Sequence, residues 1–250
     1  MLKDKVAVVT GSSRGIGFEI AREFAFRGAT VIVCSRSMTK AVKSAGLIKG
    51  KVYPEELNVI SPPTVIAKFL QNITERHKRL DILVNNAGYA FDRKIWYKKF
   101  HEVTEEEINN VIQVDLMGTF RLSQAAISLM LNNGSGVIIN ISSTPAIAGN
   151  TEGTPYSIAK AGIIAMTKNI ALEYGDNNIR AYTLALGNIS TEATLNSMTA
   201  ADKKKARSEN SMKRWGDPKE VANIAASIAD EDFSFATGNT IVIDGGAVLL

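Results

Sequence analysis

The stretch from Tyr156 to Lys160 reads Tyr-Ser-Ile-Ala-Lys, so a phenol and an ammonium stand four residues apart. On a helix, side chains at this spacing lie on one face, a single turn from each other. A tyrosine phenol has an ordinary pKa of about 10 and transfers protons poorly near neutrality. A lysine ammonium close by favours the phenolate and lowers that pKa. The pair is therefore a candidate acid/base, although the same spacing also occurs by chance on surface helices.

Short apolar runs rich in Val and Ile alternate with helical patterns along the chain. The runs near Val6, Ile82 and Val137 are apolar on both faces, which is typical of parallel strands covered by helices. This alternation predicts an α/β fold with a doubly wound parallel sheet. The expected strands cover residues 6–10, 30–34, 51–57, 82–85, 136–142, 180–186 and 240–243. The expected helices cover residues 18–27, 63–76, 105–132, 156–174 and 218–229.

No linker, repeat or low-complexity segment interrupts the 250 residues, so we expect a single domain over residues 1–250. The stretch 187–215 is polar, Lys-rich and weakly periodic. A long excursion of this kind within an α/β domain predicts a mobile substrate lid.

The composition limits the classes of partner. The net charge of +4 is too small to indicate nucleic-acid binding, although it suits an anionic small ligand. The single cysteine, Cys34, cannot form an intrachain disulfide and suits a reducing compartment. No apolar run approaches the roughly 18 residues that cross a bilayer, and the first residues lack a signal-peptide pattern. We therefore expect a cytoplasmic protein with neither a membrane nor a nucleic-acid partner.

A glycine-rich turn follows the first expected strand and reads TGSSRGIG over residues 10–17. Gly11 would permit a tight turn, Gly15 a close approach to a pyrophosphate, and Gly17 close packing of the next helix. Backbone amides at the start of that helix would face the anion. In this strand–turn–helix context, the motif predicts a dinucleotide site. The other turn residues expected to contact the cofactor are Ser13, Arg14 and Ile16.

The choice of dinucleotide depends on the end of the second expected strand, which reads Ser35-Arg36 and carries no acid. A carboxylate there would bind the ribose hydroxyls of NAD and repel a 2′-phosphate. A guanidinium can instead hold the phosphate through a forked pair of hydrogen bonds. Arg14 could add a second cation. These residues favour NADP(H) over NAD(H); the alternative is that both arginines are solvated.

The chain resembles the short-chain dehydrogenase/reductase family over essentially its whole length. The resemblance rests on the glycine turn and on five later segments in the family's order. They are LDILVNNAG (80–88), NISS (140–143), YSIAK (156–160), GNIST (187–191) and DGG (244–246). The resemblance implies one Rossmann-type sheet of about seven strands with helices on both faces. It also implies an oxidoreductase that interconverts a ketone and a secondary alcohol.

The resemblance implies catalytic roles for matched residues. Ser143, thirteen residues before Tyr156, would hold the substrate oxygen, and Ser142 is its rival. Tyr156 would give that oxygen a proton in reduction or take one in oxidation. Lys160 would lower the tyrosine pKa and hold the nicotinamide ribose. Hydride would pass directly between the nicotinamide and the carbonyl carbon.

Further matched positions are implied to contact the cofactor. Asn58 and Val59 would meet the adenine, with Asn in place of the usual Asp. Ile189 and Thr191 would meet the nicotinamide carboxamide. The segment 85–88, with Asn85, Ala87 and Gly88, would line the adenosine ribose and brace the central strand.

Asp115 is where the sequence departs from the family pattern. The family usually has Asn here, as a fourth catalytic residue that positions a water on a proton relay to the lysine. Asp can replace it if the backbone carbonyl holds the water, and impairs the relay if the amide is needed. An unpaired carboxylate is costly to bury, so we expect a partner or a raised pKa. The departure leaves open a catalytically weak, NADP(H)-binding regulatory protein.

Two features of the sequence bear on the substrate. A 3-oxoacyl thioester on acyl carrier protein would need a basic docking surface, because the carrier is acidic. Related reductases have basic residues just before the serine-bearing strand and after the tyrosine helix, where this chain has Asn132, Asn133 and the segment 176–178. This argues against that alternative substrate. The aromatic and basic stretch 89–101, which includes Trp96, could shape a substrate mouth, pack against a helix or contact a subunit.

Two features favour self-association. The expected helix 105–132 carries apolar residues on more than one face, and the C-terminal residues 247–250 are apolar. The resemblance adds that family members commonly pair through two long helices and the C-terminal edge. We therefore expect a homotetramer, or otherwise a homodimer.

Overall fold

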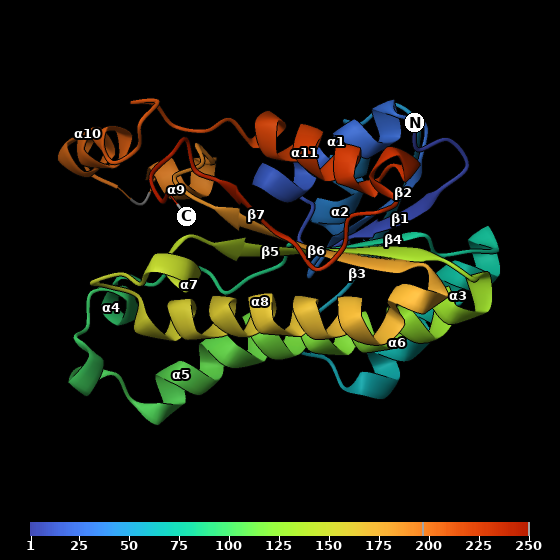
Figure 1. Ribbon diagram of the computed structural model, residues 1–250, viewed down its shortest axis with the longest axis horizontal. Helices are drawn as coiled ribbons and strands as arrows, with labels where there is room; N and C mark the ends of the chain where they lie inside the picture. Colours follow the sequence, from blue (N-terminus) through green and yellow to red (C-terminus); the bar gives the residue numbers. More distant parts are fainter. Residues whose placement is uncertain (197, 250) are drawn as a thin grey trace.

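Seven strands form one sheet in the computed structural model, which describes residues 1–196 and 198–249. Every neighbouring pair is parallel, and the strand order is β3-β2-β1-β4-β5-β6-β7 (Figure 1). This order confirms the predicted doubly wound, Rossmann-type sheet. The strands are β1 (Val6–Val9), β2 (Thr30–Ser35), β3 (Lys51–Glu56), β4 (Ile82–Asn85), β5 (Gly136–Ser143), β6 (Ile179–Leu186) and β7 (Thr240–Ile243).

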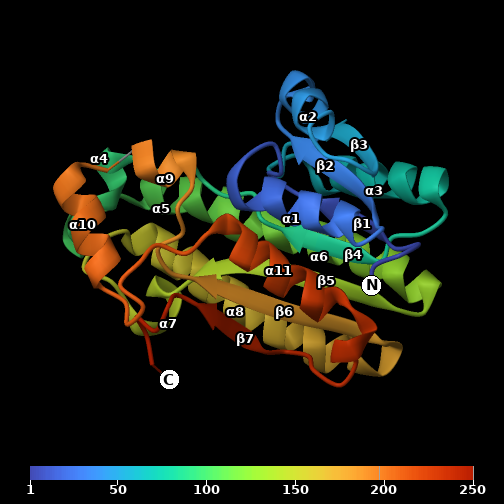
Figure 2. The same ribbon diagram turned by 90° about the horizontal axis from the view of Figure 1, so that it is seen from above.

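Helices cover both faces of the sheet, as Figures 1 and 2 show. One face carries α1 (Gly15–Phe26), α2 (Met38–Ala45) and α11 (Pro218–Ala229). The other carries α3 (Pro63–His77), α6 (Gly118–Asn133) and α8 (Thr154–Tyr174). Within the described ranges, no helix is long and apolar enough to cross a membrane.

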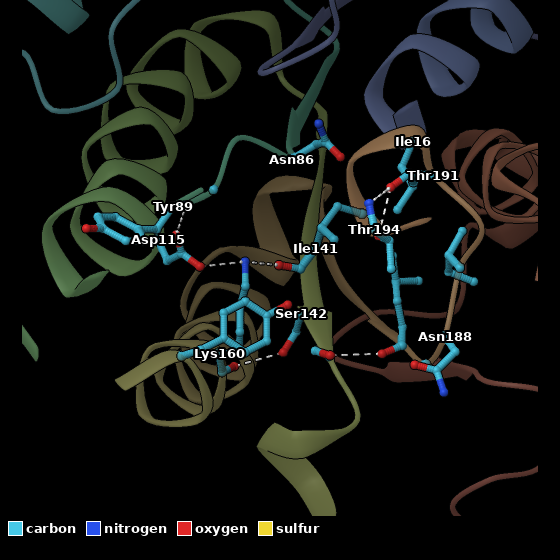
Figure 3. Close-up of a pocket in the computed structure, with 16 residues that line it drawn as sticks. Ile16, Asn86, Tyr89, Asp115, Ile141, Ser142, Lys160, Asn188, Thr191 and Thr194 are labelled. Carbon is cyan, nitrogen blue, oxygen red and sulfur yellow. Dashed lines mark hydrogen bonds and ion pairs between the residues drawn. The ribbon is translucent and has the colours of Figure 1, made fainter. Parts of the chain in front are cut away.

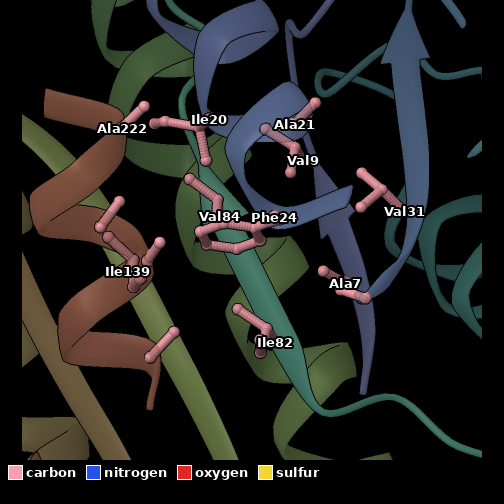
Figure 4. Close-up of a cluster of buried hydrophobic side chains, with 14 of the residues drawn as sticks. Ala7, Val9, Ile20, Ala21, Phe24, Val31, Ile82, Val84, Ile139 and Ala222 are labelled. Carbon is pink, nitrogen blue, oxygen red and sulfur yellow. The ribbon is translucent and has the colours of Figure 1, made fainter. Parts of the chain in front are cut away.

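The apolar strands are explained by burial on both faces. In β1, Ala7 and Val9 belong to the cluster under α1 and α11, which surrounds Phe24 (Figure 4). Val6 and Val8 belong to the cluster under α3 and α6. Alternate side chains of a strand point to opposite faces, so a doubly covered strand must be apolar throughout.

The predicted helix 105–132 is interrupted in the structure. It consists of α5 (Glu105–Ile112), a π-helical turn η2 (Gln113–Met117) and α6. A π turn is wider than an α turn, and such turns are frequent at functional sites. Asp115 lies inside this turn, where its side chain is fully buried.

Short helices gather at the carboxyl edge of the sheet. They are α4 (Arg93–Trp96), η1 (Phe100–Glu102), α7 (Pro145–Ala148), α9 (Glu192–Asn196) and α10 (Ala200–Ser208). The last two belong to the stretch 187–215, in which residue 197 lies outside the described residues. In open α/β sheets, ligands bind in the crevice outside the carboxyl ends of the strands.

Candidate active site

Tyr156 and Lys160 lie on one face of α8, close to its first turn. The helix begins after Gly153, which adopts a left-handed φ of +69°, and it has Pro155 in its first turn. Proline is well suited to this position because the first amides of a helix have no internal acceptor. Lys160 Nζ lies 5.4 Å from the centre of the Tyr156 ring. The predicted proximity of the two side chains is therefore present.

Lys160 is buried, and its ammonium contacts two oxygens. Its Nζ donates a hydrogen bond to Ile141 O at 3.1 Å and lies 3.2 Å from Asp115 Oδ2 (Figure 3). Burial alone would lower the pKa of the amine, but the charge of Asp115 and that of the Tyr156 phenolate outweigh it, so the pKa of Lys160 is raised. The ammonium therefore persists at neutral pH.

Asp115 holds three parts of the site together. Its Oδ1 accepts from Tyr89 N at 2.5 Å, and its Oδ2 pairs with Lys160. Its backbone carbonyl accepts from Thr119 Oγ1 at 2.7 Å. The expected partner of this buried carboxylate is thus Lys160. The carbonyl that could position a relay water is thus the acceptor of the Thr119 hydroxyl.

The two candidate serines at the end of β5 differ in what they contact. Ser142 Oγ is buried and donates to Lys160 O at 2.9 Å, so it fixes α8 against the strand. Ser143 Oγ is only partly buried and donates to Leu186 O of the neighbouring strand β6 at 3.0 Å, and both residues line the cavity. This arrangement leaves Ser143 the better placed to meet a substrate.

The glycine turn is packed closely against the end of β4. A Cβ on Gly11, which has a φ of +62°, would lie 2.9 Å from Ala87 Cα. A Cβ on Gly17 would lie 2.4 Å from Asn86 Nδ2. Asn86 Nδ2 in turn donates to Thr10 O at 2.9 Å and to Gly11 O at 3.2 Å. Asn86 belongs to the segment 85–88, which the resemblance implies to line the adenosine ribose, and here it also ties the glycine turn to the end of β4.

The predicted phosphate-binding residues are exposed. Among the described residues, none forms a hydrogen bond or an ion pair with the guanidinium of Arg14 or Arg36. The first turn of α1 carries no acid, so its amides can face an anion. Glu56, opposite Ser35 on β3, accepts from Met38 N at 2.9 Å. One acid therefore lies beside the place expected for a 2′-phosphate.

Two predicted cofactor contacts lie in the core. Asn85 is buried and donates to Ser123 Oγ and Asn140 Oδ1, so it braces the central strand without lining the cavity. Val59 is buried beneath α6, and Asn58 beside it is exposed. Any contact of Val59 with an adenine is thus left to its backbone.

A cavity of about 310 Å³ unites most of the predicted catalytic residues (Figure 3). Predicted residues that line it are Ile16, Gly88, Asp115, Ser143, Tyr156, Lys160, Ile189 and Thr191. Tyr89, Asn188 and Thr194 also line it; they lie in the segments 89–101 and 187–215, although no individual role was expected for them. The predicted phosphate and adenine contacts, among them Ser13, Gly15, Arg36 and Asn58, lie outside this cavity.

The base of the stretch 187–215 is anchored at the cavity. Ser190 N donates to Gly216 O at 2.9 Å, and Gly216 N donates to Asn188 O at 3.0 Å, so the stretch returns to its own start. Thr191 lies opposite the glycine turn, with its Cγ2 3.5 Å from the position of a Cβ on Gly15. The glycine turn and this stretch thus meet at the cavity, where Ile16 and Thr191 both line it.

Comparisons with known proteins agree with this arrangement. A family model described as enoyl-(acyl carrier protein) reductase matches residues 11–248. The chain is 36% identical to the 3-oxoacyl-(acyl-carrier-protein) reductase FabG of Thermotoga maritima, over 99% of each chain. It is 36% identical to glucose 1-dehydrogenase 2 of Bacillus subtilis, over 99% of this chain and 96% of that relative.

Among solved structures, a protein assigned as a gluconate dehydrogenase from Agrobacterium tumefaciens superposes with a TM-score of 0.92 and 26% identity. The superposition covers 99% of this chain and 98% of that one. Sequence and fold thus agree over nearly the whole length. The chain is an oxidoreductase that belongs to the short-chain dehydrogenase/reductase family.

Proposed function

We propose that this chain is an NADP(H)-dependent oxidoreductase that interconverts a ketone and a secondary alcohol. The observation that carries the proposal is the buried Lys160 ammonium beside the Tyr156 ring, with Ser143 on the same cavity. A charged lysine next to a phenol is the arrangement that lets tyrosine exchange a proton near neutrality.

Each catalytic side chain has a distinct task in this proposal. Ser143 holds the substrate oxygen by turning its hydroxyl from Leu186 O, which it contacts at 3.0 Å. Tyr156 donates a proton to that oxygen in reduction and accepts one in oxidation. Lys160 supplies the positive charge that stabilises the phenolate between these steps. The nicotinamide, when bound, would supply or accept the hydride.

The chain offers a fitting cradle for such a cofactor. Gly11 and Gly15 adopt left-handed backbone conformations, and the first turn of α1, with its free amides, begins at Gly15. Ile189 and Thr191 border the same cavity as Lys160, and Thr191 lies next to the glycine turn. The end of β2 has no acid of its own, and Arg36 follows it directly. These features support a dinucleotide with a 2′-phosphate.

Replacing Arg36 with Ala should raise the KM for NADPH by at least tenfold and leave the KM for NADH within about twofold. The reason is that the guanidinium is expected to pair with the 2′-phosphate, and a charge-assisted pair contributes roughly 1.5–3 kcal/mol. The measurement is steady-state kinetics with each cofactor, together with NADPH binding by fluorescence titration.

The companion variant Glu56→Gln removes the neighbouring negative charge while keeping an acceptor for Met38 N. It should lower the KM for NADPH, and Lys49→Ala, at an exposed position after α2, serves as the control. If Arg36→Ala changed the KM for NADPH and the KM for NADH equally, the proposed contact with the 2′-phosphate would be refuted.

A 3-oxoacyl thioester is the second candidate substrate, because one relative above is a 3-oxoacyl-(acyl-carrier-protein) reductase. The expected lack of a basic docking surface carries less weight than the sequence indicated. Asn132 and Asn133 end α6, and Asn178 O accepts from Gly136 N at the start of β5. These residues therefore lie at the opposite end of β5 from Ser143. NADPH consumption with simple ketones, diketones and acyl thioesters, compared by kcat/KM, would rank the candidates.

We also propose that the chain forms a homotetramer, or otherwise a homodimer, through α6, α8 and the C-terminal edge. Apolar side chains remain exposed there: Phe120 and Leu131 on α6, Leu172 on α8, and Leu249. Residue 250, part of the expected apolar C-terminus, lies outside the described residues. The stretch 187–215 would serve as the substrate lid of each subunit.

Gel filtration at micromolar concentration should give about four times the 27.0 kDa of one chain. Leu172 is 84% exposed, so Leu172→Glu would place a charge on the proposed interface and should yield smaller species. The control is Leu47→Glu, which changes a 67% exposed residue outside these helices. A monomeric wild-type chain would contradict the proposal.

A further inference from the structure

The segment 89–101 begins with Tyr89, which lines the cavity, and exposes several aromatic side chains. Phe91 is 46% exposed, Tyr97 45% and Phe100 77%, so none of them is explained by core packing. Exposed aromatic clusters on a soluble protein usually mark a binding surface. The segment contains α4, which lies at the carboxyl edge of the sheet (Figure 1).

Part of this segment reaches the catalytic tyrosine through a chain of ring contacts. The rings of Phe91 and Trp96 have centroids 5.4 Å apart with a tilt of 53°. The rings of Trp96 and Tyr156 have centroids 5.6 Å apart with a tilt of 54°. Both separations fall in the range of favourable aromatic pairs. An aromatic surface therefore extends from exposed Phe91 to the reacting phenol.

Trp96 is held firmly in this position. Its Nε1 donates to Glu152 Oε2 at 3.0 Å, and its carbonyl accepts from Gly153 N at 2.8 Å. A Cβ on Gly153 would lie 2.7 Å from the indole ring, so only glycine allows the ring to pack here. Asp92 caps α4 by accepting from Lys94 N at 2.9 Å. The indole is thus a fixed surface with its polar atom already satisfied.

We propose that Phe91 and Trp96 form an aromatic wall of the substrate site, and that this wall selects ketones with a flat apolar substituent, such as aryl ketones. The inference rests on the proposed function. The oxygen of any substrate must reach the hydroxyl of Tyr156, so one substituent of the carbonyl carbon lies near the ring against which Trp96 packs. A flat ring gains contact with the wall through offset or edge-to-face stacking, whereas a short alkyl group covers little of it.

The first test compares two ketones that differ in this substituent, acetophenone and 2-butanone. Trp96→Leu should raise the KM for acetophenone by roughly three- to tenfold, the size of one aromatic pair, and Phe91→Leu by less. The KM for 2-butanone should stay within about twofold in both variants. Phe100→Leu is the matched control, because Phe100 is exposed on the same segment and makes no ring contact with a described residue. Trp96→Phe should restore most of the preference.

The second test reports binding without turnover. The chain has two tryptophans, Trp96 and Trp215, so Trp215→Phe leaves Trp96 as the only indole. Acetophenone added to the NADPH complex of this variant should quench the emission saturably. The same additions to Trp96→Phe, in which Trp215 reports, should give only the linear quenching of random collisions.

Three results would overturn the wall. Equal changes in the KM for both ketones in Trp96→Leu would show that the residue only supports the fold. If Trp96→Leu or Phe91→Leu dissociated the oligomer and left the KM for acetophenone unchanged, these aromatic residues would instead form a subunit contact. Linear quenching in the Trp215→Phe variant would show that no aryl ketone docks on Trp96. If the wild-type enzyme reduces neither ketone, the proposed function fails for these substrates, and the quenching experiment alone decides the inference.

Discussion

Replacing Tyr156 with Phe should lower kcat for ketone reduction by roughly 10²- to 10⁴-fold, the usual contribution of a positioned acid/base. The variant keeps the ring that packs against Trp96 and lies 5.4 Å from Lys160 Nζ, and it loses only the hydroxyl. The fold and the affinity for NADPH should therefore change little. Stopped-flow or steady-state NADPH oxidation measures kcat, and fluorescence titration measures the dissociation constant of NADPH.

The matched control is Tyr174→Phe, at the far end of the same helix. It loses a hydroxyl too, and its kcat should match that of the wild type. Turnover by Tyr156→Phe at the wild-type rate would refute the mechanism. If the wild-type chain binds NADPH but oxidises it with none of the carbonyl substrates tested, the result would instead favour the regulatory alternative.

The sheet and the Tyr156–Lys160 pair could be predicted because both depend on short sequence patterns. Strands buried on two faces must be apolar throughout, and this fixed the positions of β1, β4 and β5 to within about a residue. A spacing of four residues fixes the relative position of two side chains on any α-helix. These properties need no knowledge of the rest of the chain.

The surroundings of the pair could not be predicted in the same way. Nothing in the segment 113–117 marks a π turn, and its effect is to place Asp115 against Lys160 of another helix. The contact between Trp96 and Tyr156 joins residues sixty positions apart. Val59 matched the family motif, yet its side chain is buried in the core. Such features depend on tertiary packing, which a local pattern does not record.

Asp115→Asn should lower the free energy of unfolding by about 3 kcal/mol at neutral pH, the lower end of the cost of breaking a buried ion pair. Asparagine has nearly the same shape and can still accept from Tyr89 N, which contacts Asp115 Oδ1 at 2.5 Å. It cannot supply the charge that faces Lys160 Nζ at 3.2 Å. Urea unfolding measures the difference. Glu107→Gln, which neutralises the partly exposed pair with Lys98, should change the stability far less.

The pH dependence of this loss follows from the pKa of Lys160. In the wild type the pKa of Lys160 is raised above its ordinary value of 10.5. The pair therefore stabilises the fold fully at pH values below 10.5, and this stabilisation is lost as the pH rises through the raised pKa. Without the carboxylate, burial dominates and the pKa of Lys160 falls. The stability gap between wild type and variant should therefore be largest near neutrality and shrink as the pH approaches the ordinary lysine value.

Catalysis should follow the same shift. In the variant, Lys160 should lose its proton at a lower pH than in the wild type. The phenolate of Tyr156 then loses the positive charge that stabilises it, because the two groups lie on one cavity. The alkaline limb of the profile of kcat for alcohol oxidation should thus move to lower pH in Asp115→Asn. Wild-type and variant profiles that coincide would mean that Asp115 fixes the π turn without setting the charge of the lysine. If Asp115→Asn both lowers the stability and shifts the pH profile of kcat, the carboxylate of Asp115 is the group that keeps the buried Lys160 charged.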